Sequence, residues 1–168
     1  GSTFVSIDGE PVGFTVPPGP FLDLAVAYTL AAGVDAAGDL LVGHFDAAGG
    51  LSDFSDADVA RTMSVAVAYS HGEGLVLAAD VGGCVRALSI TGPMLRPGEP
   101  RVLGCASGAD FSTASWSVRA TGPTTFAAAL ALTGAFDGAG STKVTWMELG
   151  LQGGRVVLTR WEETSMDV

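Results

Sequence analysis

Positive charge is scarce in this chain. Only 8 of its 168 residues are Lys or Arg, against 18 Asp and Glu, and the formal charge at pH 7 is -10. Such a surface repels a phosphate backbone, so we expect no nucleic acid partner. Long apolar runs are also missing. A helix needs roughly 18 to 20 apolar residues to span a bilayer, and glycine and aspartate interrupt every candidate before that length, including residues 21–34. We therefore expect no membrane insertion.

Histidine is equally scarce, which limits the chemistry available. His44 and His71 are the two histidines, and neither is near a G-x-S-x-G motif, so a hydrolytic triad is not supported. His44 and Asp46 have the H-x-D spacing that places two ligands on one face of a strand, and His71 could complete a mononuclear iron site. An oxygenase using these three residues is the alternative hypothesis. Solvent-facing or hydrogen-bonded histidines are the simpler interpretation, so we expect no enzyme.

The chain has two cysteines, Cys84 and Cys105, and no zinc spacing such as C-x-x-C. They flank residues 93–100, which are dense in turn formers and predict a hairpin. The register that places Leu88 opposite Arg101 also places Cys84 opposite Cys105. A disulfide there would fit an extracellular or virion location, while two free buried cysteines remain the alternative.

Glycine, proline and apolar residues are abundant and indicate a β-rich globular chain. The chain has 24 glycines and 8 prolines, and 48% of its residues are hydrophobic. We predict one domain over residues 1–168, an all-β antiparallel β-sandwich of jelly-roll type with about ten short strands. Gly1 and Ser2 look like a cloning remnant, and the polar residues 162–168 are expected to fray.

Several segments carry more specific expectations. Residues 3–16 predict a hairpin, residues 21–30 a single strand, and residues 55–59 could nucleate one helical turn. Residues 126–132 are rich in alanine, a helix former, but leave room for only about two turns, so we predict a strand.

Residues 110–151 carry a family resemblance. Trp116-Ser117-Val118 leads to Gly122-Pro123, then to an apolar strand and to residues 144–151. This order resembles the second half of galactose-binding-like, jelly-roll carbohydrate-binding modules, found in actinobacterial phage tail proteins and in secreted proteins. Their last strands commonly run W-x-V-x-x-T-A-P and V-x-F-D-D-V-x-L. The resemblance implies a jelly roll that binds glycans.

The sequence departs from that family where calcium would bind. Met147 replaces the first aspartate of the closing motif, Glu148 corresponds to the second, and the opening N-x-x-F-E segment has no match in residues 4–10. We therefore expect no cofactor, with calcium as the alternative. A separate acidic group could ligate calcium through Asp46, Asp53, Asp56 and Asp58. It lacks the order of an EF-hand, and a solvated loop is the ordinary explanation.

The closing strand also predicts a binding surface from its alternation. With period two, Met147, Leu149 and Leu151 face the core, while Trp146 and Glu148 face away. An outward indole can stack on a sugar ring while the carboxylate accepts hydroxyl hydrogens. The alternative is that a neighbouring subunit or the other sheet covers Trp146. The remaining large aromatics are expected in the core: Trp116, Trp161, Tyr28 and Tyr69.

Only 15% of the residues are charged, so much of the surface must consist of small, uncharged residues, which are easily buried. This favours a homo-oligomer, a dimer or a trimer. Our first hypothesis is a non-catalytic module of a phage virion (tail fibre, spike or decoration) or of a secreted protein, which binds cell-surface carbohydrate or mediates assembly. A purely structural capsid or tail subunit is a further hypothesis, besides the oxygenase.

Overall fold

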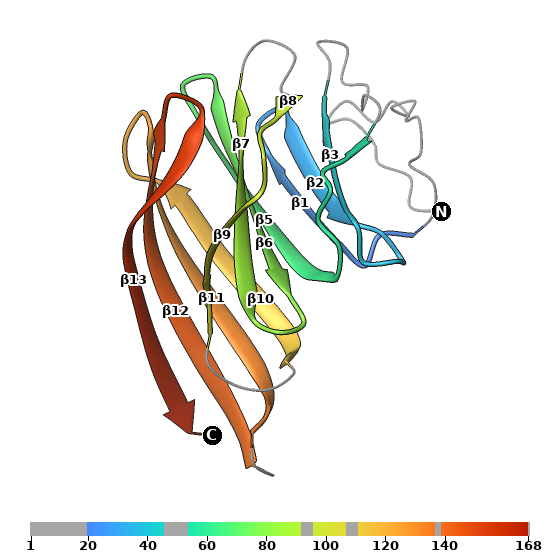
Figure 1. Cartoon of the computed structure of the whole chain (residues 1–168), viewed down its shortest axis with the longest axis vertical. Coiled ribbons are helices and arrows are strands. Elements are labelled where there is room, and N and C mark those ends of the chain that lie inside the picture. Colours follow the sequence, from blue (N-terminus) through green and yellow to red (C-terminus); the bar gives the residue numbers. More distant parts are fainter. Residues whose placement is uncertain (1–19, 46–53, 92–95, 107–110, 137–138, 168) are drawn as a thin grey trace, which may run out of the picture.

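The structure is a computed structural model that describes residues 20–45, 54–91, 96–106, 111–136 and 139–167 (Figure 1). Within these ranges the chain forms thirteen strands in three antiparallel sheets and no helix. This confirms the predicted all-β antiparallel fold. The strands are more numerous than expected, and those of the third sheet are long. No helix that could cross a membrane occurs in the described part.

Each sheet is built from strands that follow one another in the sequence. The first sheet consists of β1 (Asp23–Ala27), β2 (Leu30–Val34), β3 (Leu40–His44) and β4 (Ser55–Asp56). The middle sheet consists of β5 (Thr62–Ser70), β6 (Glu73–Asp80), β7 (Cys84–Thr91), β8 (Arg96–Pro97) and β9 (Arg101–Cys105), with β8 and β9 both paired to β7. The third sheet consists of β10 (Phe111–Ala120), β11 (Thr125–Phe136), β12 (Ala139–Gln152) and β13 (Arg155–Asp167). The described strands therefore form meanders, and the jelly-roll part of the prediction is not confirmed.

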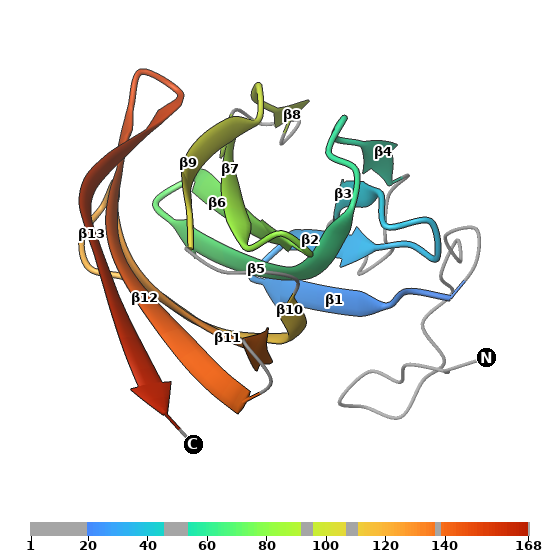
Figure 2. The same cartoon turned by 60° about the horizontal axis from the view of Figure 1, so that its bottom comes forward.

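The middle sheet lies between the other two and buries both of its faces (Figure 2). On β6, Leu75 and Leu77 pack toward the third sheet, while Val76 and Ala78 pack toward the first. A strand covered on both sides has no polar face, which explains why β6 reads as a continuous apolar run. Each fully buried leucine contributes roughly 1.5–3 kcal/mol through removal from water. The two cores thus share one sheet.

The first strand of the middle sheet, β5, is hydrogen-bonded to both flanking sheets. The carboxylate of Asp23 on β1 accepts hydrogen bonds from Ser64 Oγ (2.7 Å) and from the Val65 backbone N–H (2.9 Å). Ser70 Oγ at the other end of β5 donates to the Gly122 carbonyl after β10 (3.2 Å). These contacts satisfy polar groups along β5, the edge strand of the middle sheet, and tie it to both flanking sheets.

Three local predictions need correction, and one is confirmed. Residues 21–30 are not one strand, because Tyr28 adopts a left-handed φ of 55° and starts a tight turn into β2. Residues 55–59 contain β4 and no helical turn. Residues 162–167 do not fray but complete β13, where they pair with β12. The alanine-rich residues 126–132 lie in β11, as predicted. The hairpin expected in residues 3–16 lies outside the described residues.

One buried hydroxyl in the third sheet lacks a partner. Thr145 on β12 is fully buried, and its Oγ1 has no hydrogen-bond partner. It lies next to Met147 on the inner face, and its β11 partner is Leu130, which is also buried. A buried hydroxyl without a hydrogen bond reduces stability, because it has lost its water without replacement.

We therefore predict that Thr145→Val raises the free energy of unfolding by about 1 kcal/mol, since it keeps the branched shape and removes the hydroxyl. Urea denaturation measures the change. The control is Thr142→Val, whose hydroxyl is 3.1 Å from Thr133 Oγ1 on the outer side, and this variant should gain nothing. A Thr145→Val protein less stable than the parent would contradict the prediction.

Candidate functional site

The outer face of the third sheet carries Trp146 and Glu148, the two residues for which the sequence predicted a binding surface. On β12, Met147, Leu149 and Leu151 are buried, whereas Trp146 is 37% exposed and Glu148 is exposed as well. The period-two prediction for this strand is therefore confirmed. The described part of the chain therefore covers the indole less than it covers a core side chain.

The neighbours of Trp146 follow from strand register, because directly paired residues share a face. Ala129 of β11 and Glu162 of β13 lie on either side of Trp146, and Ser117 of β10 lies beyond Ala129. Small side chains on β10 and β11 leave one side of the indole without tall neighbours. The indole therefore has an open side next to β11 and β10.

Charged groups border the other side of the indole. Arg160 of β13 lies opposite Glu148, and its Nε and Nη2 donate to Glu162 Oε1 at 2.9 and 2.6 Å. Its Nη1 is 3.6 Å from Glu148 Oε1. The hydrogen bond to Glu162, together with the charge of that carboxylate, raises the pKa of Arg160 above its ordinary value. Exposed ion pairs of this kind contribute little stability, so their main consequence is to order donors and acceptors beside the ring. We call this surface the outer platform; its residues are Ser117, Ala129, Trp146, Glu148, Arg160 and Glu162.

Arg160 and Glu162 were missed by sequence reasoning because a β-bulge decides which side chains of β13 face outward. The two-residue turn pairs Gln152 with Arg155, and continuing this register would place Trp161 opposite Trp146. The register shifts by one between Glu148 and Leu149, so Glu162 takes that position instead. Trp161 consequently turns inward and packs against the core.

The residues of the proposed iron site are only partly described. His44 is half-buried on β3, and Asp46 lies outside the described residues. His71 lies in the exposed turn between β5 and β6 with a φ of 49°, and its Nδ1 is 2.9 Å from Ser70 Oγ. Within the described ranges, no three His, Cys, Asp or Glu side chains are grouped as metal ligands.

The acidic residues proposed for calcium are likewise partly described. Asp46 and Asp53 lie outside the described residues. Asp56 is exposed on β4, and its Oδ1 accepts the Asp58 backbone N–H at 2.8 Å, which caps a turn in which Asp58 has a φ of 55°. A carboxylate that caps its own turn accounts for Asp56 in structural terms.

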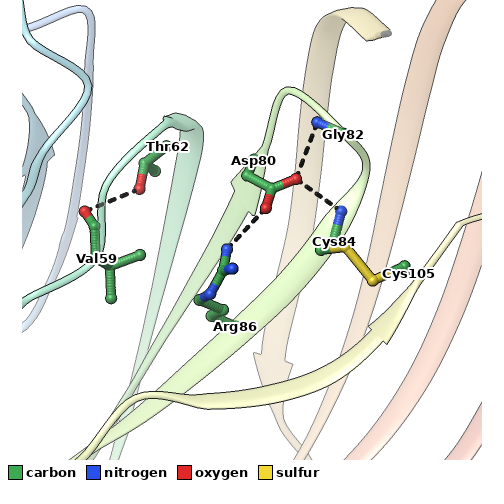
Figure 3. A network of polar contacts seen from close by, with 7 residues as sticks. All are labelled: Val59, Thr62, Asp80, Gly82, Cys84, Arg86 and Cys105. Atoms are coloured by element: carbon green, nitrogen blue, oxygen red, sulfur yellow. Dashed lines mark hydrogen bonds and ion pairs between the residues drawn. A yellow bond between two sulfur atoms is a disulfide. The ribbon is translucent and has the colours of Figure 1, made fainter. Parts of the chain in front are cut away.

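Cys84 and Cys105 form a disulfide between β7 and β9 (Figure 3). The predicted register holds at the cysteines, but it shifts by one between Val85 and Arg86, so Ala87 rather than Leu88 lies opposite Arg101. The bond is partly accessible, with Cys84 half-buried and Cys105 exposed. Because disulfides persist in oxidising compartments, this bond indicates a location outside the reducing cytosol.

Asp80 holds the start of β7 in place for this bond. Its Oδ1 accepts the backbone N–H groups of Gly82 and Cys84, both at 2.9 Å, and its Oδ2 accepts from Arg86 Nη1 at 2.7 Å (Figure 3). The carboxylate thereby closes the β6–β7 turn and fixes the backbone of Cys84 opposite β9.

The remaining aromatics divide between core and surface. Trp116 and Trp161 are half-buried and pack against the core between the middle and third sheets. Tyr28 contradicts the expectation of a core residue, because it is 78% exposed and stacks on Tyr69 at a centroid distance of 4.9 Å. It extends a row of exposed apolar side chains on β1 and its flanks, which we call the apolar stripe: Leu22, Leu24, Val26 and Tyr28.

Comparison with known proteins assigns no family. No protein-family model matches the chain, and no curated protein is significantly similar to it in sequence. The likeness of residues 110–151 to carbohydrate-binding modules therefore stays a prediction from the sequence.

The disulfide yields a direct stability prediction. Replacing both cysteines with serine, or reducing the bond, should lower the free energy of unfolding by about 3 kcal/mol, because a cross-link across 21 residues restricts the unfolded chain. Urea denaturation with and without a reducing agent measures the difference. The double serine variant is the control, since its unfolding should not respond to reductant. Identical unfolding of the parent chain in both conditions would contradict the prediction.

Proposed function

We propose that this chain is a non-catalytic interaction module of a secreted protein or of a virion component, such as a phage tail fibre, spike or decoration protein, and that it binds surface glycans through the outer platform. The single observation that carries the proposal is the exposure of Trp146 on the outer face of the third sheet, beside ordered charged groups and small neighbours.

The chemistry of the platform suits a sugar. An indole offers a flat apolar face to the C–H groups of a pyranose ring, and carboxylates and a guanidinium offer acceptors and donors to its hydroxyl groups. Ala129 and Ser117 leave space beside the indole for the next residue of a chain. An open surface favours a polysaccharide that lies across the strands over a small molecule that needs an enclosed pocket.

The disulfide supports the location in this proposal. Secreted domains and virion surfaces are where such bonds persist, and they are also where a protein meets cell-surface carbohydrate. The resemblance of residues 110–151 to jelly-roll carbohydrate-binding modules agrees with the same function.

We predict that Trp146→Ala abolishes binding on a glycan array while the melting temperature falls by only a few degrees, because the side chain is partly exposed. Trp146→Phe should retain weaker binding. The matched control is Met166→Ala, a 51% exposed residue paired with Thr142 on the same strands, and it should bind like the parent. Glycan binding by Trp146→Ala equal to that of the parent would overturn the proposal.

Assembly of identical copies is a second candidate function, favoured by the apolar stripe. Four of the seven large apolar side chains exposed in the described ranges are those of the stripe. Asp23, which alternates with the stripe residues on β1, accepts hydrogen bonds from Ser64 and Val65 of β5. In a chain of charge -10, two copies repel each other over most of their surface. An uncharged stripe meeting the same stripe of a second copy across a two-fold axis avoids that repulsion.

We therefore expect Val26→Asp to convert an oligomer into a monomer, measured by light scattering. Val102→Asp is the control, because Val102 is 53% exposed against 52% for Val26, and the change in charge is the same. Assembly through the stripe is disproved if the parent chain is monomeric at high concentration, or if Val26→Asp keeps the parent mass.

A further inference from the structure

A groove of about 630 Å³ lies where the middle and third sheets meet, away from the residues of the outer platform. One wall comes from β7 and the β8–β9 segment, and the other comes from the turn between β12 and β13 and from the first two residues of β13. Its volume is in the range of small-molecule sites. The lining residues are Ser89, Glu99, Pro100, Arg101, Gly153, Gly154, Arg155 and Val156.

Two hydrogen bonds fix the walls of this groove relative to each other. Ser89 on β7 is buried, and its hydroxyl donates to the carbonyl of Gly154 in the hairpin turn. Arg101 at the start of β9 donates from Nη1 to the carbonyl of Val156, at 2.9 Å. The two walls are therefore joined by contacts at the hairpin turn and at the start of β13, and these contacts fix the shape of the groove without a ligand.

The lining is positive although the chain is strongly acidic. Arg101 and Arg155 line the groove, and neither forms an ion pair with a carboxylate of the described residues. By contrast, ion pairs occupy Arg86, Lys143 and Arg160. Glu99 is the one carboxylate among the lining residues. Because Arg101 uses Nη1 for the carbonyl of Val156, its other guanidinium N–H groups remain available as donors.

The hairpin turn adds unobstructed backbone to the rim. Gly153 and Gly154 have φ values of 58° and 75°, which glycine adopts without strain, and a Cβ at either position would meet nothing within 4 Å. The turn therefore brings backbone to the groove with no side chain in front of it. Backbone amides and arginines are the groups that recognise oxyanions in proteins.

We propose that this groove binds the oxyanion group of an acidic ligand (a carboxylate, sulfate or phosphate), with Arg101 and Arg155 as its donors. Guanidinium groups match the planar, two-oxygen edge of such groups and form stronger hydrogen bonds to them than to neutral acceptors. The negative charge of Glu99 repels an anionic ligand and weakens the site. Removing that charge should therefore strengthen binding, whereas removing an arginine should weaken it. The site does not depend on Trp146, so it stands or falls separately from the glycan platform.

The test is a calorimetric titration of the whole chain at constant ionic strength with three probes, namely sodium sulfate, sodium phosphate and a short oligogalacturonate. Arg155→Gln should weaken binding about tenfold, since it removes charge-assisted hydrogen bonds. Within the described residues the Arg155 side chain forms no hydrogen bond or ion pair, so this variant should fold normally. Glu99→Gln should strengthen binding, which a merely structural disturbance would not do. Arg119→Gln is the control, an exposed arginine on β10 with the same change in charge.

The probes separate the sources of the oxyanion. Oligogalacturonate binding more tightly than the inorganic ions supports an acidic saccharide as ligand, and sulfate or phosphate binding more tightly supports a free or esterified ion. Absence of binding by all three probes at millimolar concentration overturns the proposal. Equal affinities for the parent and Arg155→Gln, or weaker binding by Glu99→Gln, overturn it as well. Trp146→Ala should leave these affinities unchanged whatever the glycan array shows.

Discussion

Burial of both faces of the middle sheet is the constraint on which the rest of this structure depends. Each residue of β6 from Gly74 to Ala79 is buried, and alternate side chains fill two different cores. Neither flanking sheet could bury its inner face without the middle one, because the apolar side chains of that face pack against the middle sheet. The three meanders are therefore one packing unit, although each is continuous in sequence.

Alternation of apolar residues predicted the inner and outer faces of β12, because a strand covered on one side must repeat every two residues. On β13 a single extra residue, Thr159, exchanges the two faces of the strand, and its hydroxyl donates to the Glu148 carbonyl at 3.0 Å. Nothing local in the sequence marks this bulge, so the charged half of the outer platform could not be predicted.

The exposure of Tyr28 was missed for a related reason. Residues 21–30 look uniformly apolar, and only the turn at Tyr28 reveals that β1 and β2 are different strands, one with an exposed side and one buried throughout.

The acidic composition has a structural explanation in the described turns. Asp35 Oδ1 accepts the backbone N–H groups of Ala37 and Asp39, at 2.8 and 3.0 Å. Asp56 and Asp80 cap their turns in the same way, and Asp23 binds the backbone of a neighbouring sheet. A meander needs a turn after every strand, and aspartate supplies acceptors where backbone N–H groups would otherwise lack partners. The sequence showed how many aspartates the chain has but not that they cap turns, because an aspartate that caps a turn and one that binds a metal are the same residue in a sequence.

The same constraint decides where ligands can bind. A sheet buried on both faces offers no surface except its edges, so its contribution to function must come from an edge strand or from the loops. One edge, β5, is already tied to β1 and to the turn after β10 by Asp23 and Ser70. The other edge carries β8 and β9. There the β12–β13 hairpin of the third sheet contacts this edge, and the two form the groove lined by Arg101 and Arg155. The third sheet keeps an exposed outer face, which holds the outer platform, and β1 of the first sheet keeps an exposed side, which holds the apolar stripe. The three surfaces therefore lie in three different places: on the outer face of the third sheet, on β1 of the first sheet, and between the middle and third sheets. Ligand binding at one of them need not disturb the contacts that the others require.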